Sequence, residues 1–310
     1  MITLAQYDAA MTGYKALFQK AYRAAEPDPT WAKLASPVKS NARQEIHNWL
    51  LRGSGMGLWI GNKQRQQALA SEFAVKNLPF EGTITFDRHD LEDDQTGGYD
   101  LLVQGLAEDA RNFPTKLMML LLANATATTM TLRGQSVPIA AWDGKALFAS
   151  ARTIGKDKNQ TNIYSGTGTT YDKVIADFQK ARVGMMKLKN GSGEALSRMP
   201  SIAVIPPTEA LVNSFDTILA NRAPLGTADI RQYLAGYIVN PEASGNDWMV
   251  FDVSRPVKAV MVQTREDAHM VTPAYMSEAE FERHEIVASA EARGAVVPAD
   301  WTCAALVDNS

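Results

Sequence analysis

The chain has 310 residues, of which 45% are hydrophobic and 21% are charged, and its formal net charge at pH 7 is −3. This is the composition of a globular protein that can bury a core in one large domain or two small ones. It argues against a protein that grips duplex DNA, which usually carries a dense basic stripe, and the single cysteine, Cys303, excludes an intrachain disulfide.

Secretion and membrane insertion are not indicated. The first residues lack the basic and apolar regions of a secretory signal, and the longest apolar run, Leu117–Ala123, is far shorter than the roughly 20 residues that cross a bilayer. We therefore expect a protein made in the cytosol, with no membrane partner. Cys303 is expected to be a small buried hydrophobic residue, not a nucleophile.

The first element predicted is an amphipathic helix over Leu4–Ala25. Its apolar residues recur at helical spacing and include Tyr7, Tyr14 and Phe18. The prolines of the segment 26–29 end it, because proline cannot continue a helix. The helix either docks on its own domain or packs elsewhere, and the pattern leaves both possibilities open.

Residues 36–78 are polar and dotted with glycine. The run Arg52–Gly57 lacks the spacing of a phosphate-binding loop and is interpreted as a flexible hinge. Trp59 and Phe73 are large apolar residues in an otherwise polar excursion that also contains Arg65. A two-stranded excursion is marginally stable in water, so we expect it to need another surface, such as that of a neighbouring subunit.

The stretch Phe80–Asp94 combines a strand with an acidic elbow. Residues alternate in character up to Asp87, as in a half-buried strand, and acidic residues then gather at Asp90, Glu92, Asp93 and Asp94. These acids either bind a hard metal ion or complement the free N–H groups of the helix that follows. We favour the second interpretation, because the acids precede a helix and show no established ligand spacing.

A long helix is predicted from Tyr99 to about Ala125, with an apolar stripe that includes Leu102 and Leu106. Pro114 predicts a kink, or two abutting helices. Turns are expected at Arg133-Gly134 and Asp143-Gly144.

The second half of the chain predicts a compact α/β unit. Its elements are a helix from Thr169 to about Lys189, a strand at Ile202–Ile205, a helix that starts after Pro206-Pro207, and a strand at Trp248–Val253. Two further strands, Val257–Thr264 and Ile286–Val297, are expected to return to the first domain. The α/β unit is therefore interpreted as an insertion.

Several motifs give the chain a family resemblance. The runs W-I-G-N-K-Q-R at Trp59–Arg65, F-E-G-T-I from Phe80 and D-R-H-D-L-E-D-D from Asp87, then G-G-Y ending at Tyr99, resemble the Mu-type major head subunit family of tailed bacteriophages. Asp143-Gly144 before Phe148 is a weaker echo, and the histidine that the family often carries beyond this phenylalanine is absent.

This resemblance implies an α+β chain with the Hong Kong 97-like phage capsid fold. The implied parts are an N-terminal arm and hinge (1–54), an extended loop (55–87), a peripheral domain with a long spine helix (88–160), an inserted axial domain (161–254) and return strands of the peripheral domain (255–310). The arm would lie along neighbouring subunits, and residues 221–240 would form a loop near a symmetry axis.

The function predicted is that of a major capsid protein, not an enzyme, which self-assembles into an icosahedral shell around a phage genome. The candidate assembly contacts are large or charged residues of the arm and the loop: Tyr7, Tyr14, Phe18, Trp59, Arg65 and Phe73. Expected partners are further copies of the chain in pentamers and hexamers, scaffolding, portal and decoration proteins, and packaged double-stranded DNA without sequence-specific contact. We expect no catalytic residue, metal or cofactor, and a location in the virion after assembly in the host cytoplasm.

Two alternatives remain open. One is a shell that encloses protein cargo, as in encapsulins, and the other is a metal-dependent hydrolase that uses the cluster Asp87–Asp94.

Overall fold

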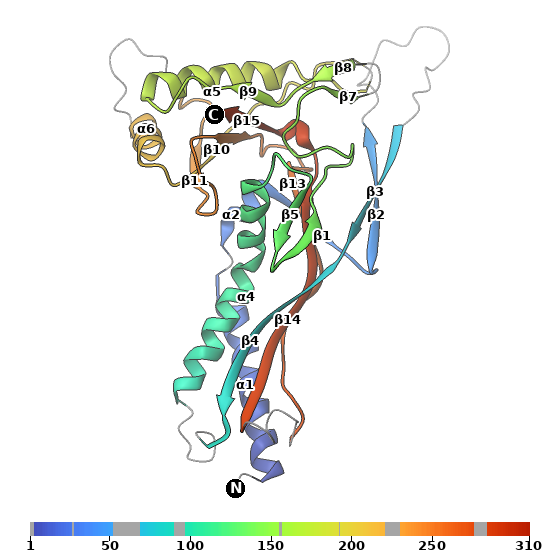
Figure 1. The fold of residues 1–310 in the computed structure, drawn as a ribbon, viewed down its shortest axis with the longest axis vertical. Coiled ribbons are helices and arrows are strands. Elements are labelled where there is room, and N and C mark those ends of the chain that lie inside the picture. The colour runs from blue at the N-terminus through green and yellow to red at the C-terminus, as the bar shows by residue number, and fades with distance from the viewer. Residues whose placement is uncertain are drawn as a thin grey trace.

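The structure, a computed structural model, describes residues 3–26, 28–51, 69–89, 97–154, 157–191, 193–220, 230–275 and 284–310. Two sheets joined by one long helix dominate this part of the chain (Figure 1). None of its helices is both long and apolar enough to cross a bilayer.

The four-stranded sheet has the order β1–β13–β14–β4. Its strands are Ala35–Lys39, Val260–Val271, Glu285–Pro298 and Leu78–Asp87. β1 is parallel to β13, and the other neighbours are antiparallel. The alternation predicted for β4 is confirmed, because its even-numbered residues are partly or fully buried and its odd-numbered residues are exposed.

Two helices, α1 (Leu4–Ala24) and α4 (Gly97–Ala123), pack on one face of this sheet. Thr3 starts α1 with a capping box, in which its hydroxyl accepts from the amide of Gln6 and the Gln6 side chain accepts from the amide of Thr3. The two helices begin at the same end of the elongated domain, near the N-terminus in Figure 1.

The long helix differs from its prediction in two respects. It runs through Pro114 as one helix, so the alternative of two abutting helices is wrong. Leu102 is 51% exposed, whereas Val103 and Ala107 are fully buried against α1 and the sheet. Leu106, the other residue named in the predicted stripe, does pack against the same buried cluster, as does Ala110 one turn later, so the stripe is confirmed beyond its first residue.

The five-stranded sheet has the order β11–β10–β12–β15–β9. Its strands are Gly236–Val239, Ile202–Ile205, Trp248–Phe251, Ala304–Asp308 and Ile163–Ser165. Helices α5 (Tyr171–Met186) and α6 (Glu209–Leu219) pack on one face of it. The end of α4 packs on the other face, with residues such as Leu121 against Val204 and Leu306. The sheet is therefore buried on both sides, which explains why β12 is apolar throughout.

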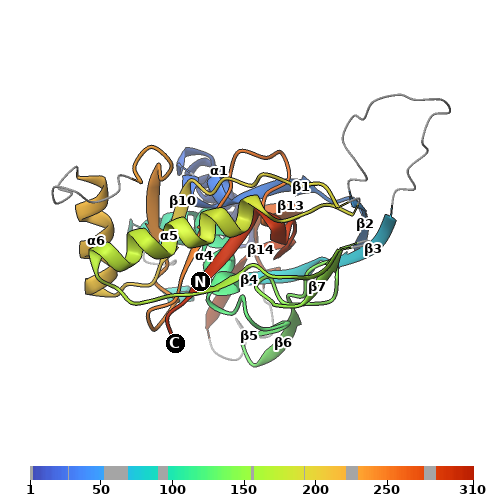
Figure 2. The same cartoon turned by 90° about the horizontal axis from the view of Figure 1, so that it is seen from above.

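The smaller elements are hairpins and short helices. The hairpins are β2–β3 (Gln44–Leu51 and Leu69–Lys76), β5–β6 (Thr129–Leu132 and Gln135–Pro138) and β7–β8 (Arg152–Ile154 and Asp157–Gln160), and the short helices are α2 (Pro29–Leu34) and the 3₁₀ turn η1 (Trp301–Cys303). Arg133 and Gly134 have positive φ angles of 46° and 77°, as the predicted two-residue turn requires. Seen from above, the β2–β3 hairpin and α6 lie at opposite ends of the molecule (Figure 2).

The division into sheets departs from the expected segments at both ends of the chain. β1 lies in the four-stranded sheet, although residues 1–54 were expected to form only an arm and hinge. β15 lies in the five-stranded sheet, between β12 and β9, although residues 255–310 were all expected to return to the first domain. β13 and β14 do belong to the four-stranded sheet, as expected, whereas the interpretation of the α/β unit as an inserted domain stays a prediction.

Candidate assembly surfaces

The β2–β3 hairpin is the feature most suited to reach another subunit. Among the described residues its two strands pair only with each other, from Gln44 opposite Lys76 to Leu51 opposite Leu69. It leaves the side of the body near the junction of the two sheets (Figure 1). Ile46 on its outer face is 58% exposed, so the hairpin offers apolar as well as polar surface.

We call the end of the hairpin nearest the body, where β2 begins at Gln44 and β3 ends at Lys76, the hairpin root. Phe73, a predicted assembly contact, lies near this root. It is half-buried against Val75, Met261 and Val297, which form a small cluster with the four-stranded sheet. It also lines an apolar groove of about 490 Å³ between the hairpin root, β4 and the β5–β6 hairpin. Phe73 therefore anchors the hairpin to its own subunit and shows one side to the groove.

The three aromatic residues of the N-terminal helix are placed differently from the prediction. Tyr7, Tyr14 and Phe18 are 1%, 4% and 0% exposed. Tyr14 stacks on Phe86 of β4 at a centroid distance of 4.8 Å, and the Tyr7 hydroxyl donates to the Pro273 carbonyl at 3.0 Å. In this conformation the helix docks on its own domain, so the assembly role of these three residues is corrected to a role in the subunit core.

The remaining predicted site residues lie outside the described part of the chain. They are Trp59 and Arg65 of the loop and Asp90, Glu92, Asp93 and Asp94 of the elbow. Their assignments remain predictions.

The residues that precede the elbow are described, and hydrogen bonds tie them to α4 and to the segment that leads into β14. The Asp87 amide donates to the Tyr99 hydroxyl of α4 at 3.1 Å, and the Arg88 amide donates to the His284 carbonyl beside β14 at 2.9 Å. The Asp87 carboxylate accepts from the His89 amide at 2.7 Å. Within the described residues no group of three or more His, Cys, Asp or Glu side chains could hold a metal ion.

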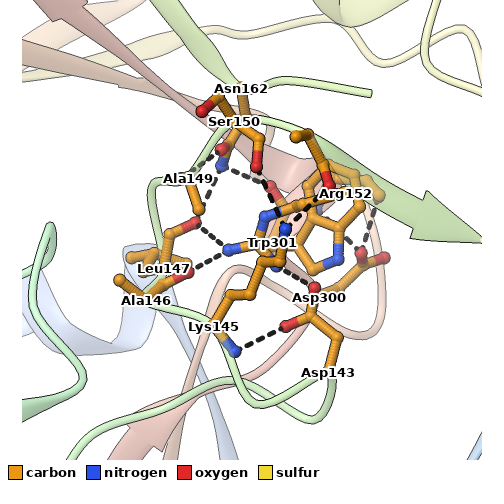
Figure 3. A network of polar contacts seen from close by, with 12 residues as sticks. Asp143, Lys145, Ala146, Leu147, Ala149, Ser150, Arg152, Asn162, Asp300 and Trp301 are labelled. Atoms are coloured by element: carbon orange, nitrogen blue, oxygen red, sulfur yellow. Dashed lines mark hydrogen bonds and ion pairs between the residues drawn. The ribbon is translucent and has the colours of Figure 1, made fainter. Parts of the chain in front are cut away.

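A second polar site joins the segment after β6 to the end of the chain (Figure 3). The guanidinium of Arg152 is fully buried and bonds to Asp143 at 2.5 Å, to the Leu147 carbonyl at 3.0 Å and to the Ala146 carbonyl. It lies over the ring of Trp301, 4.5 Å from the centroid. Burial lowers the pKa of Arg152, and the charge of Asp143 opposes that shift.

Asn162 completes this junction from the other side. Its carbonyl oxygen accepts from the Ala149 amide at 3.0 Å, and its amide group donates to the carbonyls of Leu147, Trp301 and Ala304 at 2.9 to 3.2 Å. These four backbone groups belong to two segments, residues 147–149 and 301–304, so one buried side chain holds the two segments together (Figure 3). We interpret the network as structural, because hydrogen bonds and a cation–π contact connect its members, although Arg152 Nε and Trp301 Nε1 are buried without a hydrogen-bond partner among the described residues.

Cys303 lies in the same region and is inert in the way predicted. It is fully buried, and burial raises the pKa of its thiol. A thiolate is the reactive form of cysteine, so this environment does not suit a nucleophile.

Sequence reasoning missed the polar residues at the hairpin root and at the junction, chiefly Ser40, Asn77, Gln263, Arg152 and Asn162. A weak signal was available, because Asn77 interrupts two apolar alternations and Gln263 is a lone amide in an apolar strand. A buried amide needs partners, but the sequence does not show which distant segments supply them.

The family model of the Mu-like prophage major head subunit gpT matches residues 7–174, more than half of the chain. The chain is 31% identical over 122 residues to the major capsid protein of Escherichia phage Mu, covering 39% of each protein. It is 24% identical over 142 residues to the Mu-like prophage FluMu major head subunit of Haemophilus influenzae, covering 46% of this chain and 42% of that protein. The matched parts thus span about two fifths of the length of these relatives.

Solved structures show the fold. The structure resembles a chain of the procapsid of bacteriophage JBD30 with a TM-score of 0.58 and 19% identity, over 100% of this chain and 77% of that chain. It also resembles a chain of the virus-like particle from Pyrococcus furiosus, with a TM-score of 0.54 and 8% identity over 95% and 98% of the two chains. The predicted Hong Kong 97-like capsid fold is confirmed.

The family model accounts for residues of both sheets, from α1 through β4, α4 and β9 to the start of α5. A head subunit is a structural protein, which confirms the prediction that the chain is not an enzyme. The chain belongs to the Mu-like prophage major head subunit gpT family.

Proposed function

We propose that the chain is a major capsid protein that assembles into the icosahedral head of a Mu-like phage. The observation that carries this proposal is the β2–β3 hairpin, whose strands pair only with each other among the described residues and extend beyond the body of the subunit. A two-stranded sheet is marginal by itself, so a neighbouring subunit is the natural source of the missing surface. Family membership supports the same role.

Assembly of the shell needs contacts between subunits and no catalytic step. The hairpin, the loop that carries Trp59 and Arg65, and the residues exposed at the two ends of the molecule would each contribute a modest interface. Closed symmetric assembly into pentamers and hexamers multiplies such interfaces into a stable shell. The four-stranded sheet with α1 and α4 would form the peripheral domain, and the five-stranded sheet with α5 and α6 the axial domain.

The finer partners belong to the same proposal. Scaffolding, portal and decoration proteins would act with the shell. In support, the structure also resembles a chain of the bacteriophage JBD30 capsid decorated with minor capsid protein trimers. Double-stranded DNA would be enclosed without sequence-specific contact, in keeping with the net charge of −3. The finished protein would reside in the virion, after assembly in the host cytoplasm.

A shell that encloses protein cargo is the second candidate, because the virus-like particle from Pyrococcus furiosus shares the fold over most of its length. Family membership favours the phage head. Mature particles purified from the host separate the two: electron microscopy should show closed shells, and their main content should be double-stranded DNA, not a cargo protein. A constant internal cargo protein would instead establish the second candidate.

A further inference from the structure

The two points at which the chain enters and leaves the β2–β3 hairpin are buried and joined to each other. Ser40 lies between β1 and β2, and Asn77 lies between β3 and β4. They are 3% and 2% exposed, and the Asn77 amide donates to the Ser40 hydroxyl at 2.7 Å and to the Ala42 carbonyl at 2.8 Å. Ser40 and Asn77 are therefore held by side-chain hydrogen bonds in addition to the pairing of the strands next to them.

Two residues of the central strand β13, Gln263 and Thr264, are hydrogen-bonded to this pair. Gln263 is 1% exposed, and its amide donates to the Asn77 side-chain carbonyl at 2.8 Å. The backbone amide of Ser40 donates to the Thr264 carbonyl at 2.9 Å. The hairpin root is thus bonded directly to the middle of the four-stranded sheet.

The hydrogen bonds run in one direction through the whole group. Because the Gln263 amide nitrogen is the donor to Asn77, its carbonyl oxygen accepts from His47 Nε2 of β2 at 2.8 Å. Asn77 donates to Ser40, and Ser40 donates to the Glu45 carboxylate of β2 at 2.9 Å. Each of these side chains thus has a partner within the group, and a connected network of hydrogen bonds rigidifies the segments that it joins.

Strands β13 and β14 pack closely where the hairpin root meets the four-stranded sheet. Gly294 of β14 lies against the Gln263 carbonyl, so closely that a Cβ at this position would collide with the backbone. Gly294 is paired with Thr264 on one side and with Leu78, the first residue of β4, on the other. The strand that leads out of the hairpin is therefore seated against the strand that carries Gln263.

We propose that Ser40, Asn77 and Gln263 form a latch that fixes the direction of the β2–β3 hairpin in the free subunit, before any neighbour binds. The hairpin is then offered to a neighbour at a preset angle, which reduces the ordering that binding must otherwise supply. The latch is a property of the single chain. Only its consequence, that the angle of the hairpin helps to set the geometry of the shell, rests on the proposed function.

Hydrogen–deuterium exchange of the unassembled subunit tests the latch. Asn77→Asp keeps the shape of the side chain but removes the donors to Ser40 and Ala42, and Ser40→Ala is a milder break of the same link. Each variant is expected to speed exchange of the paired amides of β2 and β3 by roughly tenfold or more, because a lost buried hydrogen bond lowers the local opening free energy. Exchange in α5 and β12 should not change.

Asn240→Asp is the matched control. Asn240 is 1% exposed and donates to the Met119 carbonyl of α4 at 2.9 Å, so the same substitution breaks an equally buried amide far from the hairpin. It should leave hairpin exchange at the rate of the unsubstituted chain. If Asn77→Asp does not fold, Ser40→Ala decides the matter.

Two results would overturn the proposal. One is hairpin exchange at the rate of an unfolded chain in the unsubstituted subunit. The other is an Asn77→Asp or Ser40→Ala variant that folds and whose hairpin exchanges no faster than that of Asn240→Asp. Neither result depends on whether the chain forms shells, so failure of the latch is distinguishable from failure of the capsid assignment.

Discussion

Asp143 and Arg152 form an ion pair that is almost closed to water, since the Arg152 side chain is fully buried and that of Asp143 is 12% exposed. Asp143→Asn should destabilise the subunit by about 3–5 kcal/mol, because the buried guanidinium loses its countercharge. The free energy of unfolding, measured with denaturant, checks this value.

Glu81→Gln is the matched control for that change. Glu81 pairs with Arg133 at 3.3 Å, but the two side chains are 63% and 77% exposed. Exposed pairs contribute about 0–1 kcal/mol, so this variant should stay near the unsubstituted chain. If the two variants lose equal free energy of unfolding, the buried Asp143–Arg152 pair stabilises the subunit no more than the exposed pair does.

Glu45 gives the hairpin root a dependence on pH. Its carboxylate accepts from the amides of Asn41 and Ala42 and from the Ser40 hydroxyl, and these bonds lower its pKa from the ordinary 4.5, with a smaller contribution from the charge of His47. A lowered folded-state pKa means that the stabilisation is fully present above about pH 4.5 and is lost as pH falls through the folded-state value.

The melting temperature of Glu45→Gln measures this contribution. The difference between the unsubstituted chain and the variant should be present above about pH 4.5 and should shrink as the pH falls below it. A difference that grows as the pH falls would contradict the assigned hydrogen bonds.

Among the secondary-structure elements, those with long regular patterns were predicted well. The helix predicted from Thr169 to about Lys189 is an example, since α5 spans Tyr171–Met186 and its apolar residues at helical spacing, Val174, Phe178, Ala181 and Met185, are all fully buried. β4 and α6 were also found where their patterns placed them. Each of these elements packs one face on a sheet or on a helix pair. The spacing of its apolar residues therefore shows which face is buried.

Short strands and their partners could not be predicted in the same way. β11 has four residues, and it was expected to be part of a loop, while β15 was assigned to the wrong sheet. Four residues carry too little periodicity to identify β11. The partners of β15 are distant in the chain, since β12 lies more than fifty residues earlier and β9 earlier still. The candidate site failed for a related reason: Tyr7, Tyr14 and Phe18 were recognised as an apolar face, but the surface that covers them comes from α4, β13 and β4.

The acidic elbow remains a prediction at the scale of an element. If Asp93 and Asp94 cap and orient α4, changing both to Asn should cost little, because Asn also caps a helix, whereas changing both to Ala should cost about 1–2 kcal/mol. Melting curves with chelator and with added divalent cations check this. A cation that stabilises the unsubstituted chain, but neither double variant, would indicate a metal site instead.

For the molecule as a whole, the predicted role of Trp59 separates assembly from folding. A large aromatic residue on a polar loop is a typical interface anchor, so Trp59→Ala should weaken assembly by about 2 kcal/mol or more per contact while the subunit's melting temperature stays nearly unchanged. Trp31→Ala is the control, because Trp31 packs against the shared core and its loss should lower the melting temperature. If Trp59→Ala instead lowers the subunit's melting temperature and leaves assembly unchanged, Trp59 packs within its own subunit.

The central claim is that this chain forms shells, and sedimentation velocity tests it most directly. The purified protein, examined over a range of concentration and salt, should sediment as shells or as ring-shaped pentamers and hexamers, which electron microscopy of the same fractions would show. A single compact species of 33.8 kDa under all these conditions would contradict the account.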